Sequence, residues 1–174
     1  MKFYSICCLF LGFTLSLSAQ AVYDSEEEAE KQYNINIKQT HLDGVYIPSS
    51  IAEAMEELKK LSDVEALKKF ASADIDAVAE NLQYGLGRWM IINWQFYDGS
   101  RLSHLMRGNG VKTPDAMAQY LIRHFHAYLN NKEIDEKQLL AIVNEKHEQK
   151  MKEMRANGKV LKSETRKIEK PDNH

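Results

Sequence analysis

The sequence contains almost no cysteine. Among its 174 residues only Cys7 and Cys8 are cysteines, and both lie in the apolar N-terminal segment. From residue 22 onward the chain therefore has no disulfide, no nucleophilic thiol and no thiolate metal ligand. Such a chain must be held together by a buried hydrophobic core, and its length suffices for one domain of ordinary size.

Residues 1–21 have the composition of a secretory signal peptide. Lys2 supplies a positive charge, residues 3–17 are uncharged and mostly apolar, and Ala19 and Ala21 provide small residues for cleavage. The apolar run is shorter than the roughly 20 residues that a membrane-spanning helix needs. We therefore expect an exported protein, cleaved after Ala19 or Ala21, that is periplasmic or secreted and has no integral membrane span after cleavage.

The remainder of the chain has no excess of positive charge. Removing Lys2 with the signal peptide leaves 22 basic and 25 acidic side chains, a net charge of −3. A surface that binds the nucleic-acid backbone needs an excess of lysine and arginine. The sequence therefore predicts no nucleic-acid partner.

Residues 22–44 are predicted to form an extended or mobile N-terminal arm. Consecutive glutamates at 26–28 favour a solvated segment, and apolar residues alternate with polar ones over 33–37, as in a short strand. Asp43-Gly44 is a two-residue turn signal. A small hairpin and an extended arm lying on the helical body are the two alternatives.

Helix-start signals recur through residues 45–143, which we assign to one helical domain. A hydroxyl or carboxylate side chain stands before each apolar-periodic segment, where it can accept hydrogen bonds from the first helical turn. Ser50 and Glu53 have the spacing of a capping box. The predicted caps are Ser50, Asp63, Asp74 (or Ser72), Ser100, Thr113 and Asp135.

The centre of this domain is the segment 85–97, which contains both tryptophans. On a helical wheel Trp89, Trp94 and Tyr97 share one face with Asn93, and only a narrow strip is polar. A helix that is apolar nearly all round is buried, so we interpret these aromatic side chains as core rather than as a sugar or peptide pocket. The sequence predicts an all-α fold, a single compact bundle of about six or seven helices around a buried Trp-bearing helix, preceded by an extended arm.

The last predicted helix begins at Asp135 and changes character midway. Leu139, Leu140 and Val143 form an apolar stripe, after which lysine and glutamate dominate. We expect residues 144–174 to form a projecting helix and a disordered basic tail. That region is either simply solvated or in weak contact with an acidic surface.

Two patterns resemble catalytic or metal-binding sites. His124 and His126 lie about 200° apart on a helical wheel, so they cannot bind one ion together, and we predict no metal and no cofactor. Ser100 and His104 have the spacing of a nucleophile and its base on a helix. Neither an orienting group nor an oxyanion site accompanies them, so we interpret Ser100 as a helix cap and assign no catalytic residue.

Polar residues around the Trp-bearing segment form a candidate binding site. Asn93 lies on the apolar face and needs hydrogen-bond partners if it is buried. Arg101 opposes the dipole at the start of its helix, which favours a specific partner. That partner is an Asp or Glu of the same chain, or a carboxylate of a ligand or partner protein. The candidate set is Arg88, Asn93, Ser100, Arg101 and His104.

Four motifs in this region resemble a family of uncharacterised bacterial domains, over roughly residues 45–135. Ile92 and Thr113 stand where that family usually has Arg and His. The resemblance implies a domain boundary and carries no established activity. The motifs are Val45–Pro48, Gly85–Trp89 followed by Asn93-Trp94, Gly99–Leu102, and Pro114–Met117 leading to His126–Asn130.

These observations favour an exported, non-enzymatic interaction domain that binds a protein or peptide in the periplasm or outside the cell. The signal peptide, the lack of a coherent catalytic set and the half-amphipathic last helix support this hypothesis. The alternative is a small periplasmic hydrolase or ligand-binding protein, with its site at the five candidate residues.

Overall fold

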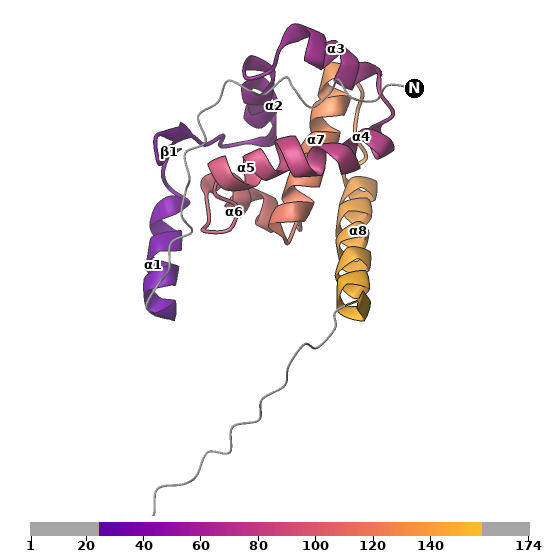
Figure 1. Ribbon diagram of the computed structural model, residues 1–174. Helices are drawn as coiled ribbons and strands as arrows, with labels where there is room; N and C mark the ends of the chain where they lie inside the picture. The colour runs from indigo at the N-terminus through magenta and orange to yellow at the C-terminus, as the bar shows by residue number, and fades with distance from the viewer. Residues whose placement is uncertain (1–24, 158–174) are drawn as a thin grey trace, which may run out of the picture.

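The computed structural model describes residues 25–157 (Figure 1). The predictions for the signal peptide at 1–21 and for the tail beyond Asn157 concern segments outside the described residues. Within the described range one two-stranded hairpin is the only β-structure, so the predicted all-α class is confirmed. No helix between residues 25 and 157 has both the length and the apolar character needed to cross a membrane.

The elements follow one another through short connections. Figure 1 shows most of the helices gathered into one body, with α1 and the lower part of α8 extending from opposite sides of it. In chain order the elements are α1 (Glu26–Asn36), β1 (His41–Leu42), β2 (Val45–Tyr46), α2 (Ile51–Lys60), α3 (Val64–Ser72), α4 (Ile75–Leu82), the π-helix η1 (Gln83–Gly87), α5 (Arg88–Asn93), α6 (Arg101–Gly108), α7 (Pro114–Leu129) and α8 (Glu136–Asn157).

The predicted N-caps are confirmed. At each position the side-chain oxygen accepts a hydrogen bond from a backbone N–H of the first turn, which satisfies groups that the helix itself leaves unpaired. Asp74, rather than Ser72, caps α4. The capping residues are Ser50, Asp63, Asp74, Ser100, Thr113 and Asp135.

The N-terminal arm differs from its prediction, because residues 26–36 form a helix and 33–37 contain no strand. Ser25 Oγ accepts a hydrogen bond from Glu28 N at 3.2 Å. The three glutamates interpreted as a solvated segment occupy the first turn of α1, where negative charge is favourable. Of the two alternatives for the turn at Asp43, the hairpin is correct.

The hairpin turn has both central residues in the left-handed region. Asp43 has a φ of 48° and Gly44 a φ of 78°, which matches the two-residue turn favoured by an Asp-Gly sequence. β1 and β2 pair antiparallel, with His41 opposite Tyr46. This hairpin places Leu42 in the core.

Two helices form the centre of the bundle. The 16-residue α7 packs against α2, α3, α4, α5, α6 and α8, and much of its length is buried. The Trp-bearing α5 packs against α7, and Trp94, which follows it, is only 1 % exposed. Trp89 is partly buried and meets Trp94 edge to face, with ring centroids 5.6 Å apart.

The Trp-bearing segment is helical over a different range from the one predicted. The glycines do not break the chain, since Gln83–Gly87 form a π-helix that joins α4 to α5. Gly87 leaves room for the Gln83 side chain, because a Cβ there would lie 3.0 Å from Gln83 Oε1. α5 ends at Asn93, so Tyr97 does not share the buried face and is 55 % exposed.

Helix α1 is fastened to the body by the Tyr33 ring and by Asn36, whose Nδ2 donates to the Asp98 carbonyl at 3.4 Å. Tyr33 packs on Gly99, whose φ is 89° and where an added Cβ would lie 2.1 Å from the ring. The Tyr33 hydroxyl lies 2.8 Å from His104 Nδ1, and the Arg107 guanidinium lies 5.6 Å from the ring centroid. α1 is thereby held beside α6 and the loop that precedes it.

Helix α8 contacts the body beyond the predicted apolar stripe. Leu139 and Val143 are buried as predicted. Asn144 Nδ2 donates to the Gly110 carbonyl at 3.1 Å, and Lys146 Nζ lies 3.0 Å from a Glu80 carboxylate oxygen. The helix continues to Asn157, so residue 144 does not mark the end of its contact with the body.

Candidate functional site

Ser100 and His104 have separate structural roles. The Ser100 hydroxyl is fully buried and accepts from Ser103 N at 3.3 Å, while Ser103 Oγ accepts from Ser100 N at 2.8 Å. This reciprocal pair is a capping box at the start of α6. The His104 imidazole is hydrogen bonded to the Tyr33 hydroxyl and not to the Ser100 hydroxyl. The geometry therefore gives Ser100 no general base.

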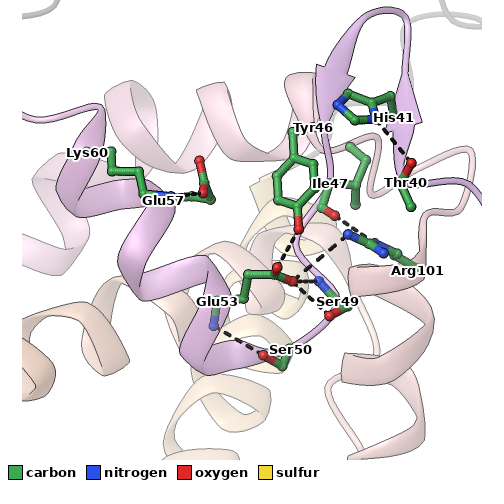
Figure 2. Close-up of polar contacts among 10 residues, drawn as sticks. All are labelled: Thr40, His41, Tyr46, Ile47, Ser49, Ser50, Glu53, Glu57, Lys60 and Arg101. Atoms are coloured by element: carbon green, nitrogen blue, oxygen red, sulfur yellow. Dashed lines mark hydrogen bonds and ion pairs between the residues drawn. The ribbon is translucent and has the colours of Figure 1, made fainter.

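Arg101 is bonded to groups of its own chain (Figure 2). Its Nε donates to the Ile47 carbonyl at 2.7 Å, and its Nη2 lies 3.9 Å from Glu53 Oε2. The guanidinium also lies over the Tyr46 ring, 5.3 Å from the centroid. The sequence left two kinds of partner open for Arg101, an acidic residue of the same chain or a carboxylate of a ligand or partner protein. The structure shows the first, Glu53.

Glu53 is the centre of this polar cluster. Its carboxylate accepts from Ser49 N at 2.5 Å, from Ser49 Oγ at 2.8 Å and from the Tyr46 hydroxyl (Figure 2). The Ser49 N–H, followed by the Tyr46 hydroxyl, lowers the pKa of Glu53 to about 2. The predicted capping box is half correct, because the carboxylate reaches the N–H of Ser49 rather than that of Ser50.

We call this cluster the junction, and it comprises Tyr46, the Ile47 carbonyl, Ser49, Glu53 and Arg101. It ties the hairpin to the starts of α2 and α6.

Asn93 is satisfied locally. Its Nδ2 donates to the Trp89 carbonyl at 2.9 Å, one helical turn earlier, and the residue is only partly buried. α5 ends at this residue, so Asn93 does not lie in the middle of a buried face. It contributes no free polar group to a site.

Arg88 is the one candidate that lines a large cavity. The cavity measures about 860 Å³ and lies between α1, the hairpin, η1 and α5. The Arg88 side chain is exposed and forms no hydrogen bond or ion pair with any residue in the described range 25–157. The other four candidates do not line this cavity, so the structure does not bring the predicted set together.

Several residues that the sequence did not single out accompany Arg88 in this cavity. Three large apolar side chains are exposed along it, Tyr84 at 78 %, Tyr97 at 55 % and Ile35 at 42 %. The Asp98 carboxylate also lines it and has no hydrogen-bond or ion-pair partner among the described residues. Burial, with a smaller contribution from the neighbouring carboxylate of Asp43, raises the pKa of Asp98.

A smaller cavity of about 500 Å³ adjoins the first one and lies between η1, α7 and α8. The two cavities share four lining residues, Gln83, Tyr84, Asp115 and Lys150. The Lys150 ammonium lies over the Tyr84 ring, 5.8 Å from its centroid. We call the two cavities together the groove.

The histidines of α7 have different partners. His126 Nε2 lies 3.0 Å from the Ala73 carbonyl, whereas His124 Nε2 lies 3.4 Å from Glu136 Oε1 without forming a hydrogen bond. Burial lowers the pKa of His124, and the Glu136 carboxylate partly opposes that shift. Among residues 25–157 no group of three or more His, Cys, Asp or Glu side chains could hold a metal ion.

The motifs that carried the family resemblance lie on β2, η1, α5, α6 and α7, which build the junction and one wall of the groove. Residues 47–129 match the model of a domain of unknown function (DUF6794). The match begins at the residue after β2 and stops at the last residue of α7, so α1, the hairpin and α8 lie outside it.

The DUF6794 match agrees with the predicted resemblance over roughly residues 45–135 and attaches no activity to it. No curated protein matches the chain, and no solved structure matches its fold. The DUF6794 region contains Arg88, Tyr84 and Asp98, whereas Ile35 and Lys150 come from outside it.

Proposed function

We propose that this protein is an exported, non-enzymatic interaction domain whose groove binds a protein or peptide in the periplasm or outside the cell. The observation that carries the proposal is the coincidence of exposed apolar side chains and unpaired charges in one concave surface. Exposed apolar surface in a hollow is typical of binding sites, and Tyr and Arg are enriched among residues that dominate binding energy. The composition of residues 1–21 supports export.

The structure around the groove also supports a binding role. Tyr84 projects from η1, and π-helical turns are often found at functional sites. Asp98 remains partly buried without a partner, which is unfavourable for the ionised form in the absence of a ligand. Groups that are unsatisfied in the free protein are suited to a partner that supplies the missing charge.

The alternative hydrolase has no supporting contact. It needs Ser100, Arg101 and His104 to face a common space, yet their side chains are bonded to Ser103, Ile47 and Tyr33. We therefore propose no catalytic role for these residues.

Localisation is tested by expressing the complete chain and separating cytosolic, envelope and secreted fractions. Mass spectrometry of the recovered protein should show a new N-terminus after Ala19 or Ala21. Uncleaved protein that stays in the cytosol would contradict export.

Binding is tested by recovering partners from the envelope fraction with wild type and with Arg88→Glu. Lys69→Glu is the control, because Lys69 is exposed on α3 and lines neither cavity. We expect partners to be recovered by wild type and by the control but not by Arg88→Glu. Equal recovery by all three proteins would place the binding surface outside the groove.

A further inference from the structure

The groove is elongated rather than round. Its two cavities meet at Tyr84 and Lys150, and their lining runs from α1 past α5 and η1 to α8. Figure 1 shows α5 and α4 in one line, from beside α1 toward α8. Helix α5 alone rises roughly 8 Å from Arg88 to Asn93, the length of two to three residues of extended chain, and the hairpin and η1 continue the lining at its two ends.

Charges of both signs line this groove, and only some of them are paired. At the hairpin end Asp43 and Asp98 lie close enough for one carboxylate to raise the pKa of the other. Asp43 accepts a hydrogen bond from the amide of Gln95. Toward α8 Lys146 pairs with Glu80 and Asp115 accepts from the Gln83 amide, whereas Arg88 has no ion-pair partner among the described residues.

Arg88 and Asp98 are unpaired although they line the same cavity. A guanidinium and a carboxylate within 4 Å would form an ion pair, and these two side chains do not. A ligand that carries both signs of charge can neutralise both groups at once. Charge-assisted hydrogen bonds of this kind are the stronger class, and Arg suits the bidentate binding of a carboxylate.

We propose that the groove binds an extended segment of a partner protein, with a carboxylate of that segment on Arg88 and a lysine or arginine side chain on Asp98. This inference rests on the proposed function and adds the chemistry of the ligand to it. Tyr84, Tyr97 and Ile35 contact apolar side chains of the segment between and beside its charges. The order of the two charges fixes the direction in which the segment lies.

The dimensions of the groove favour a peptide over a compact small molecule. Small-molecule pockets measure about 300–1,000 Å³ and enclose most of their ligand. The larger cavity alone approaches the upper end of that range, and the second continues it along the same wall. An extended chain with alternating side chains matches a surface of this length.

A displayed library of random 12-residue peptides tests the proposal on the purified full-length protein. Wild type should enrich peptides with one acidic and one basic residue in a fixed order and spacing. Arg88→Glu should replace the acidic preference by a basic one. The double variant Arg88→Glu/Asp98→Lys should enrich the reversed order.

Synthetic peptides from the wild-type selection provide the quantitative test. Replacing the acidic residue of the peptide by glutamine should weaken binding to wild type about tenfold, as measured by fluorescence anisotropy. The same replacement in the peptide should not change its affinity for the Arg88→Glu variant, because the positive charge of Arg88 is already gone. Lys69→Glu and Glu133→Lys are matched charge reversals at exposed positions outside the groove, and both should behave as wild type.

Each other outcome counts against a defined part of the proposal. Enriched peptides whose charges do not follow the two reversals would overturn the inferred ligand chemistry and leave the groove as a binding surface. If wild type enriches no peptides beyond those that the double variant also enriches, both the ligand chemistry and the proposed function are overturned. Circular dichroism of every variant must match wild type, so that loss of binding is not loss of fold.

Discussion

Arg88 and Arg101 are each the first residue of a helix, α5 and α6 respectively, but they have contrasting surroundings. Arg101 belongs to the junction, where a backbone carbonyl, a carboxylate and an aromatic ring of its own chain surround it. Arg88 faces the groove, and no described residue pairs with it. The same residue type thus serves stability in one region and is available for binding in the other.

The comparison teaches that polar residues near helix starts must be sorted by their partners rather than by their position. At the junction charges of opposite sign lie together, and the pKa of Glu53 is lowered as expected for a stabilised carboxylate. In the groove the pKa of Asp98 is raised, as expected for a carboxylate that is destabilised. Neutralising Glu53 and neutralising Asp98 should therefore change stability in opposite directions.

The largest effect on stability is expected for Arg101→Met. This substitution removes the hydrogen-bond donor to the carbonyl of the fully buried Ile47 and the cation over the Tyr46 ring. An unpaired buried acceptor costs about 1–3 kcal/mol, and a cation–π contact contributes about 0.5–1 kcal/mol. We expect the free energy of unfolding to fall by about 2–3 kcal/mol in urea denaturation.

Arg155→Met is the matched control, because Arg155 is exposed on α8. It should leave the free energy of unfolding within about 0.5 kcal/mol of wild type. If Arg101→Met changes stability no more than this control does, the junction is not stabilising.

Glu53→Gln should have the next largest effect, a loss of about 1–2 kcal/mol at pH 7, because hydrogen bonds to a charged acceptor are replaced by weaker ones. The folded pKa of about 2 lies below the ordinary value of 4.5. The stabilisation is therefore complete above about pH 4.5 and is lost as the pH falls toward 2.

Urea midpoints at pH 7, 4.5 and 3 check this pH dependence. The difference between wild type and Glu53→Gln should shrink across that range. Glu65→Gln serves as a control, since that carboxylate is exposed and pairs only with the exposed Lys68. A difference that stays constant with pH would contradict the assigned pKa.

Asp98→Asn should have a smaller effect of opposite sign, a gain in stability at pH 7. Its raised folded pKa means that the ionised form is disfavoured in the native state, so the penalty is present at neutral pH and disappears in acid. Thermal melts should show a higher Tm for the variant at pH 7 and equal values at pH 3. A lower Tm at pH 7 would show that the carboxylate has a stabilising partner.

The smallest effect on stability is expected for Arg88→Ala, within about 0.5 kcal/mol of wild type, because no described residue loses a partner. If Arg88→Ala loses peptide binding at an unchanged urea midpoint, Arg88 serves binding while Arg101 serves stability. If Arg88→Ala loses as much stability as Arg101→Met, the two arginines do not differ in this way.

Features that depend on a few neighbouring residues could be predicted from the sequence. The caps at Ser50, Asp63 and Thr113 form through hydrogen bonds that span two or three residues, so their local pattern suffices. The Asp43-Gly44 hairpin turn is equally local. The all-α class followed from these signals and from the apolar periodicity between them.

Features that depend on distant contacts, or on where a helix ends, could not be predicted from the sequence. The Ile47 carbonyl that binds Arg101 lies 54 residues away in sequence, and His104 meets Tyr33 across 71 residues. The helical wheel assumed one continuous helix to Tyr97, but the chain turns at Gln95, whose φ is 49°. The groove is formed by residues from α1 to α8, and no local pattern indicates it.

The core described above does not stop at the limits of the DUF6794 match. Leu42 on one side, and Leu139 and Val143 on the other, belong to the same buried cluster as the matched helices. A truncated expression fragment cut at residues 47 and 129 would expose the surface of α7 that α8 covers, and its solubility would suffer. The unit to clone, label and crystallise should therefore include the residues on both sides of the match that complete this core, from Leu42 to Val143 at the least.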